Sequence, residues 1–202
     1  GWTYGEVLDK AAAGDFRANM LAGEYWMGLY YLNRGDLPLA CLEHMQHFFR
    51  DAATASGHPA PKLMMTDPYG IFGIFKAQPM QPEHAEWLAA CRKLAEKGDM
   101  DAVTALYTIT DLPEAELRRY LAPLEKKAAS GDQDALAQLA FIKVDWLKEN
   151  PANVIETLKQ YWKNAKPVLL ARIGELALAL DGKDGRGWRD TAIQSLSRAA
   201  EK

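Results

Sequence analysis

Two histidines in one predicted helix are the first residues of this sequence that could do chemistry. His44 and His47 form an HxxH pattern, which places both imidazoles on roughly the same helical face. Such a pair can begin a metal site, but zinc needs further ligands, and neither His58 nor His84 is close in the sequence. We interpret the pair as solvated or partly buried side chains, and we expect no metal and no cofactor.

Paired carboxylates are the second candidate for chemistry. One pair is Glu114 with Glu116, and the other is Asp132 with Asp134. Two close carboxyl groups can divide general acid and general base roles. However, each pair lies at the start of a predicted helix, where the helix dipole favours acidic side chains. The sequence also contains no GxSxG, HExxH or CxxC motif and no glycine-rich phosphate loop. We therefore expect that the protein is not an enzyme.

Aromatic side chains crowd the helix predicted over residues 16–33, and they favour binding over catalysis. The expected core stripe of this helix consists of Ala18, Leu21, Ala22, Tyr25 and Leu29. That stripe leaves Trp26 and Tyr30 on another face, with Tyr31 beside them. Aromatic residues are enriched at binding hot spots. Two interpretations stand: these rings anchor a partner protein, or they pack against the N-terminal helix or cap the stack of hairpins.

The stretch TDPYGIFGIFKAQPMQP, residues 66–82, is the most irregular part of the sequence. Asp67-Pro68 and Gly70 interrupt a helix. The residues that follow are nonetheless strongly apolar, namely Ile71, Phe72, Ile74 and Phe75. One interpretation is a short, distorted helix packed into the domain. The other is a hydrophobic loop that enters a groove of a partner, with the segment 70–76, beginning at Gly70, as a second contact.

A repeated phrase indicates how the chain positions these residues. AEKGDMDAVTAL (95–106) and AASGDQDALAQL (128–139) share their Ala, Gly-Asp, Ala and Leu positions, and AAAGDFRANMLA (11–22) is a third copy. Glycine suits the left-handed backbone just past a helix end. The following Asp can cap the next helix. The phrase therefore predicts tight helix-to-helix turns, with Gly98 and Gly131 at positive φ.

Prolines alternate with these turns, and together they divide the chain into helices. The prolines near predicted helix starts are Pro38, Pro82, Pro113 and Pro151. We expect helices at about 3–13, 16–33, 37–55, 82–97, 100–110, 113–129, 133–148, 151–164, 167–181 and 188–201. Fixed-period helical hairpins stack because none buries its apolar face alone. The predicted fold is an all-α, right-handed α-solenoid of about five stacked hairpins in a single domain, 1–202.

Composition excludes several classes of partner. The formal net charge is −3, and no dense run of lysine and arginine marks a nucleic-acid surface. No apolar run approaches the ~20 residues that a membrane-spanning helix needs. The chain opens GWTY without an initiator Met, which fits either a processed exported protein or a trimmed one.

The two cysteines are expected to be buried free thiols. Cys91 lies seven residues before Gly98, whereas Cys41 lies sixteen before Gly57. On equivalent neighbouring helices, that mismatch is roughly 13 Å along the axis at 1.5 Å per residue. A disulfide tolerates at most about 7 Å between its Cα atoms.

The repeated phrases AEKGDMDAVTALY and AASGDQDALAQLA, with TAIQSLSRAAEK and HAEWLAACRKLAEKGD, resemble the Sel-one-like repeat family, a subclass of tetratricopeptide-type helical repeats. The resemblance covers most of the chain, although the second unit is degenerate and two units are short. It implies a protein–protein adaptor. Some bacterial members resemble immunity proteins that neutralise antibacterial phospholipase effectors of type VI secretion.

Two hypotheses about function thus follow from the sequence analysis. The first is a bacterial immunity or adaptor protein that binds a cognate secreted effector, a toxin of the lipase class, in the periplasm. The alternative is a structural scaffold or regulatory adaptor in a cell-envelope or signalling complex, and a cytoplasmic location stays open. Neither hypothesis names the partner or the oligomeric state.

Overall fold

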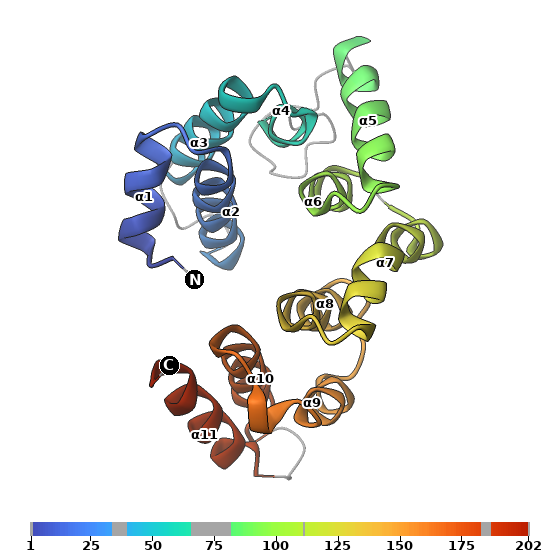
Figure 1. The fold of residues 1–202 in the computed structure, drawn as a ribbon. Coiled ribbons are helices and arrows are strands. Elements are labelled where there is room, and N and C mark those ends of the chain that lie inside the picture. Colours follow the sequence, from blue (N-terminus) through green and yellow to red (C-terminus); the bar gives the residue numbers. More distant parts are fainter. Residues whose placement is uncertain (1, 34–39, 66–81, 111, 183–186, 202) are drawn as a thin grey trace. The chain divides into compact units, whose positions relative to one another are not determined.

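The structure is a computed structural model that describes residues 2–33, 40–65, 82–110, 112–182 and 187–201, without the side chains of 30–33, 40 and 82. Throughout these residues the ordered elements are helical (Figure 1). They are α1 (Tyr4–Ala12), α2 (Phe16–Asn33), α3 (Ala40–Ser56), α4 (Pro59–Met65), α5 (Pro82–Ala95), α6 (Met100–Ile109), α7 (Glu114–Ala129), α8 (Gln133–Asp145), α9 (Pro151–Lys159), the 3-10 helix η1 (Trp162–Asn164), α10 (Pro167–Leu180) and α11 (Trp188–Ala200). The all-α prediction is confirmed for this part of the chain.

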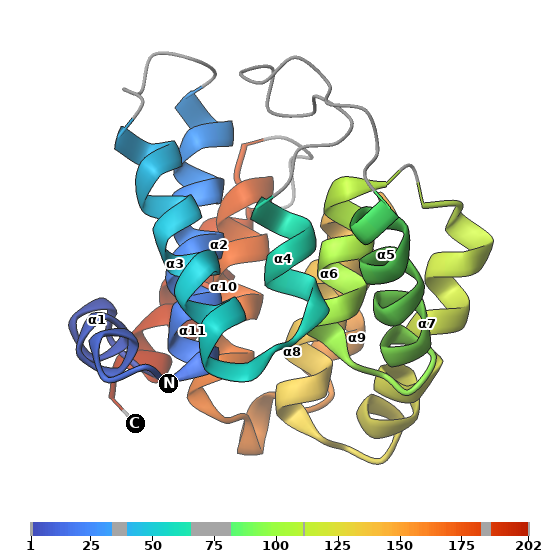
Figure 2. The same cartoon turned by 90° about the horizontal axis from the view of Figure 1, so that it is seen from above.

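The chain divides into two compact units, Gly1–Tyr120 and Leu121–Lys202, and the boundary falls inside α7. In the first unit, α2 packs between α1 and α3, and α4 contacts α3, α5 and α6 (Figures 1 and 2). In the second unit, α10 packs against α8, α9 and α11. We call α2, α4, α6, α8 and α10 the A helices, and α3, α5, α7, α9 and α11 the B helices that follow them.

The turns between B and A helices have the geometry that the repeated phrase predicts. Gly98 and Gly131 have φ of 83° and 87°, which confirms their left-handed conformation. The next residue caps the following helix: the Asp99 carboxylate accepts from Ala102 N–H at 2.9 Å, and Asp132 accepts from Ala135 N–H at 3.1 Å. Each backbone turn is therefore specified by two adjacent residues.

A helix that the sequence did not predict begins the second A element. Gly57 has φ of 66°, and α4 starts directly after His58, whose ring Nδ1 accepts from Ala60 N–H at 3.1 Å. Histidine thus takes the capping position that aspartate holds elsewhere. We placed no helix at 59–65 in the sequence analysis, although Pro59 is compatible with the first helical turn. Residues 66–81, including Gly70, lie outside the described residues.

Polar contacts join A helices near their N-terminal ends. In the first unit, Arg17 of α2 forms an ion pair with Asp101 of α6. In the second unit, Lys166 Nζ, just before α10, lies 2.9 Å from Asp134 Oδ2 of α8, and its backbone N–H donates to Gln133 Oε1 at 2.5 Å. The first contact joins α2 to α6, between which α4 lies in the chain order, and the second joins the consecutive A helices α8 and α10.

Both cysteines are buried free thiols, as the spacing predicts. Cys91 is completely shielded from solvent, and burial, with a smaller contribution from Asp99, raises the pKa of its thiol to about 12. A thiol with this pKa stays protonated at neutral pH and is a poor nucleophile.

Substitution of Gly131 tests the turn geometry. A methyl group at Gly131 would meet no atom within 4 Å, so Gly131→Ala introduces backbone strain without a clash. We expect the free energy of unfolding to fall by about 1–2 kcal/mol. Gly5→Ala is the matched control, because Gly5 lies in the first turn of α1 with open space around it, and alanine there is expected to be neutral or slightly stabilising. Equal losses for both variants in urea denaturation would contradict this assignment.

Candidate functional site

Aromatic side chains of α1, α2 and α3 form one continuous group at the surface of the first unit. The ring centroids of Tyr4 and Tyr25 are 4.7 Å apart, and those of Tyr25 and Trp26 are 5.9 Å apart. Trp26 in turn stacks on His44 at 4.6 Å with an interplanar angle of 25°. We call Tyr4, Tyr25, Trp26 and His44 the aromatic surface.

The members of the aromatic surface differ in exposure. Tyr4 and Tyr25 are 42% and 47% exposed, and His44 is also exposed. Trp26 is only partly accessible, because its ring lies between Tyr25 and His44. Two half-exposed tyrosines supported by a packed tryptophan are typical of a binding surface, since such rings bring large contact area at low entropic cost.

Tyr25 corrects the sequence analysis, which placed it in the core stripe of α2. It is exposed instead, and the deep positions of α2 include Met20 and Asn19, neither of which has any accessible surface. The Asn19 side chain donates to Ala11 O at 3.2 Å and to Asp15 O at 3.0 Å, so it ties the end of α1 to α2. Because α1 packs on α2 at this point, the buried face of α2 is rotated from the one that its own periodicity indicates.

Of the other predicted binding residues, the structure describes the side chain of Trp26. Trp26 contacts His44 of α3 and interacts with Tyr4 of α1. Its indole Nε1 is buried and makes no hydrogen bond of normal geometry to a described residue. The Tyr4 hydroxyl is near enough that this indole partly offsets the rise in the Tyr4 pKa that burial causes. The side chains of Tyr30 and Tyr31, and the segment 70–76, lie outside the described residues.

Ionisable groups gather where α2, α4 and α6 begin. His58 Nε2 lies 3.1 Å from Asp99 Oδ2, and this hydrogen bond, followed by the helix-cap bond from Ala102, lowers the pKa of Asp99. Both ring nitrogens of His58 are engaged, because Nδ1 accepts from Ala60 N–H. A histidine–aspartate pair can serve as a base, but these contacts assign it to capping two helices.

Glu24 of α2 has a strongly perturbed carboxyl group. Burial raises its pKa to about 7, although Arg17 favours the ionised form and Asp101 opposes it. Arg17 is already paired with Asp101. The charge on Glu24 is therefore only partly compensated, and the group changes protonation near neutral pH.

The histidines of the HxxH pattern lie in different surroundings. His44 stacks on Trp26, whereas His47 Nε2 lies 3.7 Å from Asp51 Oδ2 one turn along α3. Within the described residues, no three side chains of His, Cys, Asp or Glu gather in a geometry that could hold a metal ion.

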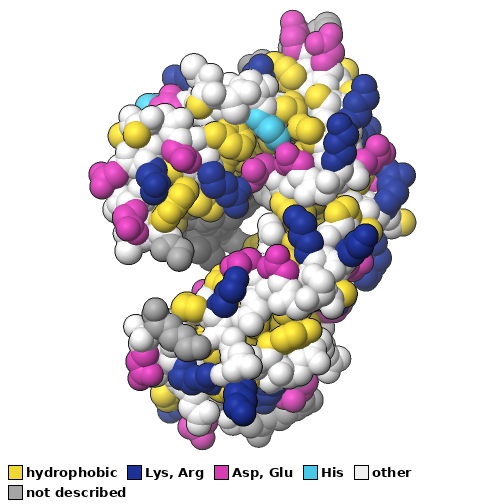
Figure 3. Space-filling view, viewed as in Figure 1, with side chains coloured by type: hydrophobic (Ala, Val, Ile, Leu, Met, Phe, Trp, Pro, Cys, Tyr) yellow, Lys and Arg dark blue, Asp and Glu magenta, His cyan; other side chains and the backbone are white. Residues whose placement is uncertain are grey.

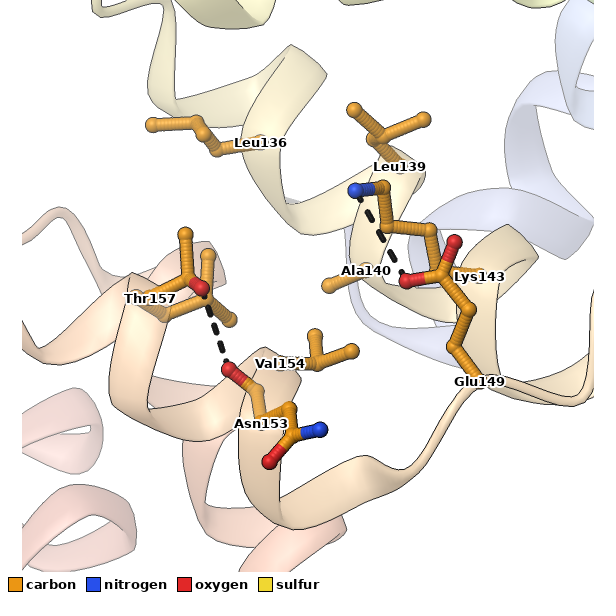
Figure 4. A pocket seen from close by; sticks show the side chains of 9 residues that line it. Leu136, Leu139, Ala140, Lys143, Glu149, Asn153, Val154 and Thr157 are labelled. Atoms are coloured by element: carbon orange, nitrogen blue, oxygen red, sulfur yellow. Dashed lines mark hydrogen bonds and ion pairs between the residues drawn. The ribbon is translucent and has the colours of Figure 1, made fainter.

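A small pocket opens between α8 and α9 in the second unit (Figure 4). Its volume is about 110 Å³. The apolar lining consists of Leu136, Leu139, Ala140, Val154 and Leu158. Polar groups surround its mouth: Lys143 Nζ lies 3.8 Å from Glu149 Oε2, and Asn153 and Thr157 lie on the α9 side. The sequence analysis did not identify this site, since no motif marks it.

Charged side chains do not form a patch of one sign on the face that Figure 3 shows. Lysine and arginine side chains are interspersed there with aspartate and glutamate. Among the described helices, none is both long enough and apolar enough to cross a membrane.

Comparison with known proteins found no relative. No family model, no curated protein and no solved structure matches this chain.

Proposed function

We propose that this chain is a helical-repeat protein that binds another protein through the aromatic surface of its first unit. The observation that carries the proposal is the pair Tyr4 and Tyr25, half exposed and in contact on two different helices. Rings held by Trp26 and His44 lose little freedom on binding, which lowers the entropic cost of association. Cys91 is shielded from solvent, His58 caps a helix, and Arg17 is paired with Asp101. These states favour structural roles for the three side chains.

The repeat arrangement supports this function. In each unit, consecutive A helices contact one another, α4 with α6 and α8 with α10, as stacked hairpins do in solenoids that bind proteins. We propose that the hairpins continue as a right-handed α-solenoid of about five repeats, the architecture that the resemblance to Sel-one-like repeats implies. Tyr30, Tyr31 and the segment 70–76 remain proposed contacts of the same partner.

The more specific proposal is a bacterial immunity or adaptor protein that neutralises a secreted effector in the periplasm. Its support is the resemblance of the Gly-Asp phrases alone. A structural scaffold in a cell-envelope or signalling complex is the alternative. Genomic neighbourhood separates the two, because an adjacent toxin gene indicates immunity, whereas an envelope operon indicates scaffolding. If the partner is toxic, co-expression of this chain is expected to restore growth.

The Tyr25→Ala variant tests the binding surface. The partner is the protein that co-purifies with this chain from its source cells, and affinity is measured by titration calorimetry with both proteins purified. A truncated hot-spot aromatic costs ~2 kcal/mol or more, so we expect Kd to rise at least about thirtyfold.

Ile193→Ser is the matched control for this experiment. Ile193 is 56% exposed on α11 in the second unit and is outside the aromatic surface. We expect this variant to bind like the parent protein. If both variants bind with the parent affinity, the partner does not use the aromatic surface. The melting transition of Tyr25→Ala is measured in parallel, since Tyr25 also contacts Tyr4.

A further inference from the structure

Glycine recurs at one position of the A helices and lets the following B helix pack closely. The turn before α2 is at residue 14, and Gly23 lies nine residues after it. The turn before α10 is at residue 165, and Gly174 also lies nine residues after it. A methyl group at Gly23 would lie 2.5 Å from Phe49 Cε1 of α3, and one at Gly174 would lie 2.6 Å from Leu196 Cγ of α11. In both hairpins, a B-helix side chain therefore occupies the space above a glycine.

The equivalent position of α8 holds alanine. Ala140 lies nine residues after Gly131 and is one of the residues that line the pocket between α8 and α9. Its methyl group takes up the space into which a B-helix side chain projects in the other two hairpins. The pocket opens beside Ala140, between α8 and α9.

The size and lining of the pocket match one branched aliphatic side chain. A cavity of about 150 Å³ lined by Leu, Ile and Phe takes up benzene. The pocket here is smaller, about 110 Å³, and its inner wall is aliphatic. Leu158 and Val154 are buried beneath it, whereas Asn153 and Thr157 are exposed at its mouth. An open mouth of this kind admits a side chain that remains attached to a peptide backbone.

The mouth offers complementary polar groups to that backbone. The Asn153 carboxamide has both donor and acceptor atoms, as a peptide bond requires. Lys143 and Glu149 place opposite charges at one edge, 3.8 Å apart and each about one-third exposed. A ligand segment with an acidic and a basic residue beside its aliphatic residue would therefore find an opposite charge for each.

We propose that the pocket between α8 and α9 binds one leucine or isoleucine side chain of a peptide segment from a partner protein, with charged residues of both signs beside it. The proposal deepens the protein-binding function above and rests on it for the identity of the partner. The site itself is contained in the second unit, so it can be tested without that partner.

The probe is the peptide acetyl-Ala-Glu-Leu-Lys-Ala-amide, titrated into the full chain carrying ¹³C-labelled Leu and Val methyl groups. We expect saturable shifts of the methyl signals of Leu136, Leu139, Val154 and Leu158. The same peptide with Ala in place of Leu is expected to bind at least tenfold more weakly. Shifts that do not saturate, or that are the same for both peptides, would overturn the proposal.

Two variants that fill the pocket complete the test. Ala140→Leu fills it from α8, and Thr157→Leu fills it from the exposed side of α9, so the second variant serves if the first does not fold. Each is expected to raise the Kd of the leucine peptide at least tenfold, and unchanged binding to a folded variant would contradict the assignment. The peptide experiment tests only the pocket, whereas Tyr25→Ala with the native partner tests the aromatic surface. A peptide that does not bind would therefore contradict the pocket proposal and leave the proposed function to its own test.

Discussion

Phe49→Ala is expected to lower the free energy of unfolding by about 3–5 kcal/mol, the usual cost of removing a fully buried phenylalanine ring. Phe49 has no accessible surface, and its ring lies against Gly23 of α2. The ring therefore joins α2 and α3, which carry Tyr25, Trp26 and His44 of the aromatic surface. Denaturant unfolding, followed by circular dichroism, measures the loss.

A double-mutant cycle with Gly23 isolates the contact between the two helices. Gly23→Ala alone adds a methyl group that clashes with the Phe49 ring, and overpacking of this kind costs about 1–3 kcal/mol. In the Phe49→Ala background the clash is gone, and alanine becomes neutral or favourable because it is the better helix former. Additive losses in the double variant would show that the ring does not rest on Gly23.

Glu24→Gln is expected to raise the free energy of unfolding at pH 8 by about 2–3 kcal/mol. The folded-state pKa of Glu24 is about 7, above its ordinary value of 4.5, because burial disfavours the ionised form. Each tenfold change in the protonation equilibrium is worth about 1.4 kcal/mol. Between pH 4.5 and about pH 7, the two pKa values, the folded protein binds more protons than the unfolded chain. The free energy of unfolding therefore falls as the pH rises through this range.

The pH dependence separates this effect from an ordinary surface substitution. Below about pH 4.5 the Glu24 carboxyl is protonated in both folded and unfolded states, and the variant and parent are expected to be nearly equal in stability. Glu43→Gln is the control, because Glu43 is an exposed glutamate of α3. A constant difference in stability between Glu24→Gln and the parent from pH 4 to pH 8 would show that folding does not raise the pKa of Glu24.

Local rules of sequence predict the turns of this fold well. The Gly-Asp phrase needs only a left-handed residue followed by a cap, and both requirements are met within a few residues. The phrase therefore identifies the turns at Gly98 and Gly131 without any knowledge of packing. The same rule fails at α4, because His58 caps that helix with a ring nitrogen where the phrase has aspartate.

Properties that depend on contacts between helices could not be predicted in this way. Tyr25 lies on the apolar stripe of α2 when that helix is considered alone, but α1 packs against α2 and changes which face is buried. The raised pKa of Glu24 depends mainly on its burial by neighbouring helices, with a smaller contribution from Asp101 of α6. The pocket beside Ala140 depends on how closely α9 approaches α8, and a single alanine gives no local signal of that distance.

The central claim is that a partner protein covers the aromatic surface of α1, α2 and α3, and site-specific photo-crosslinking in the source cells tests it most directly. A benzophenone amino acid is placed at position 25 in one sample and at position 193 in another, since both native side chains are about half exposed. The account predicts a covalent adduct with one protein, of a single defined mass, from position 25 and none from position 193. No adduct from position 25, or the same set of adducts from both positions, would contradict it.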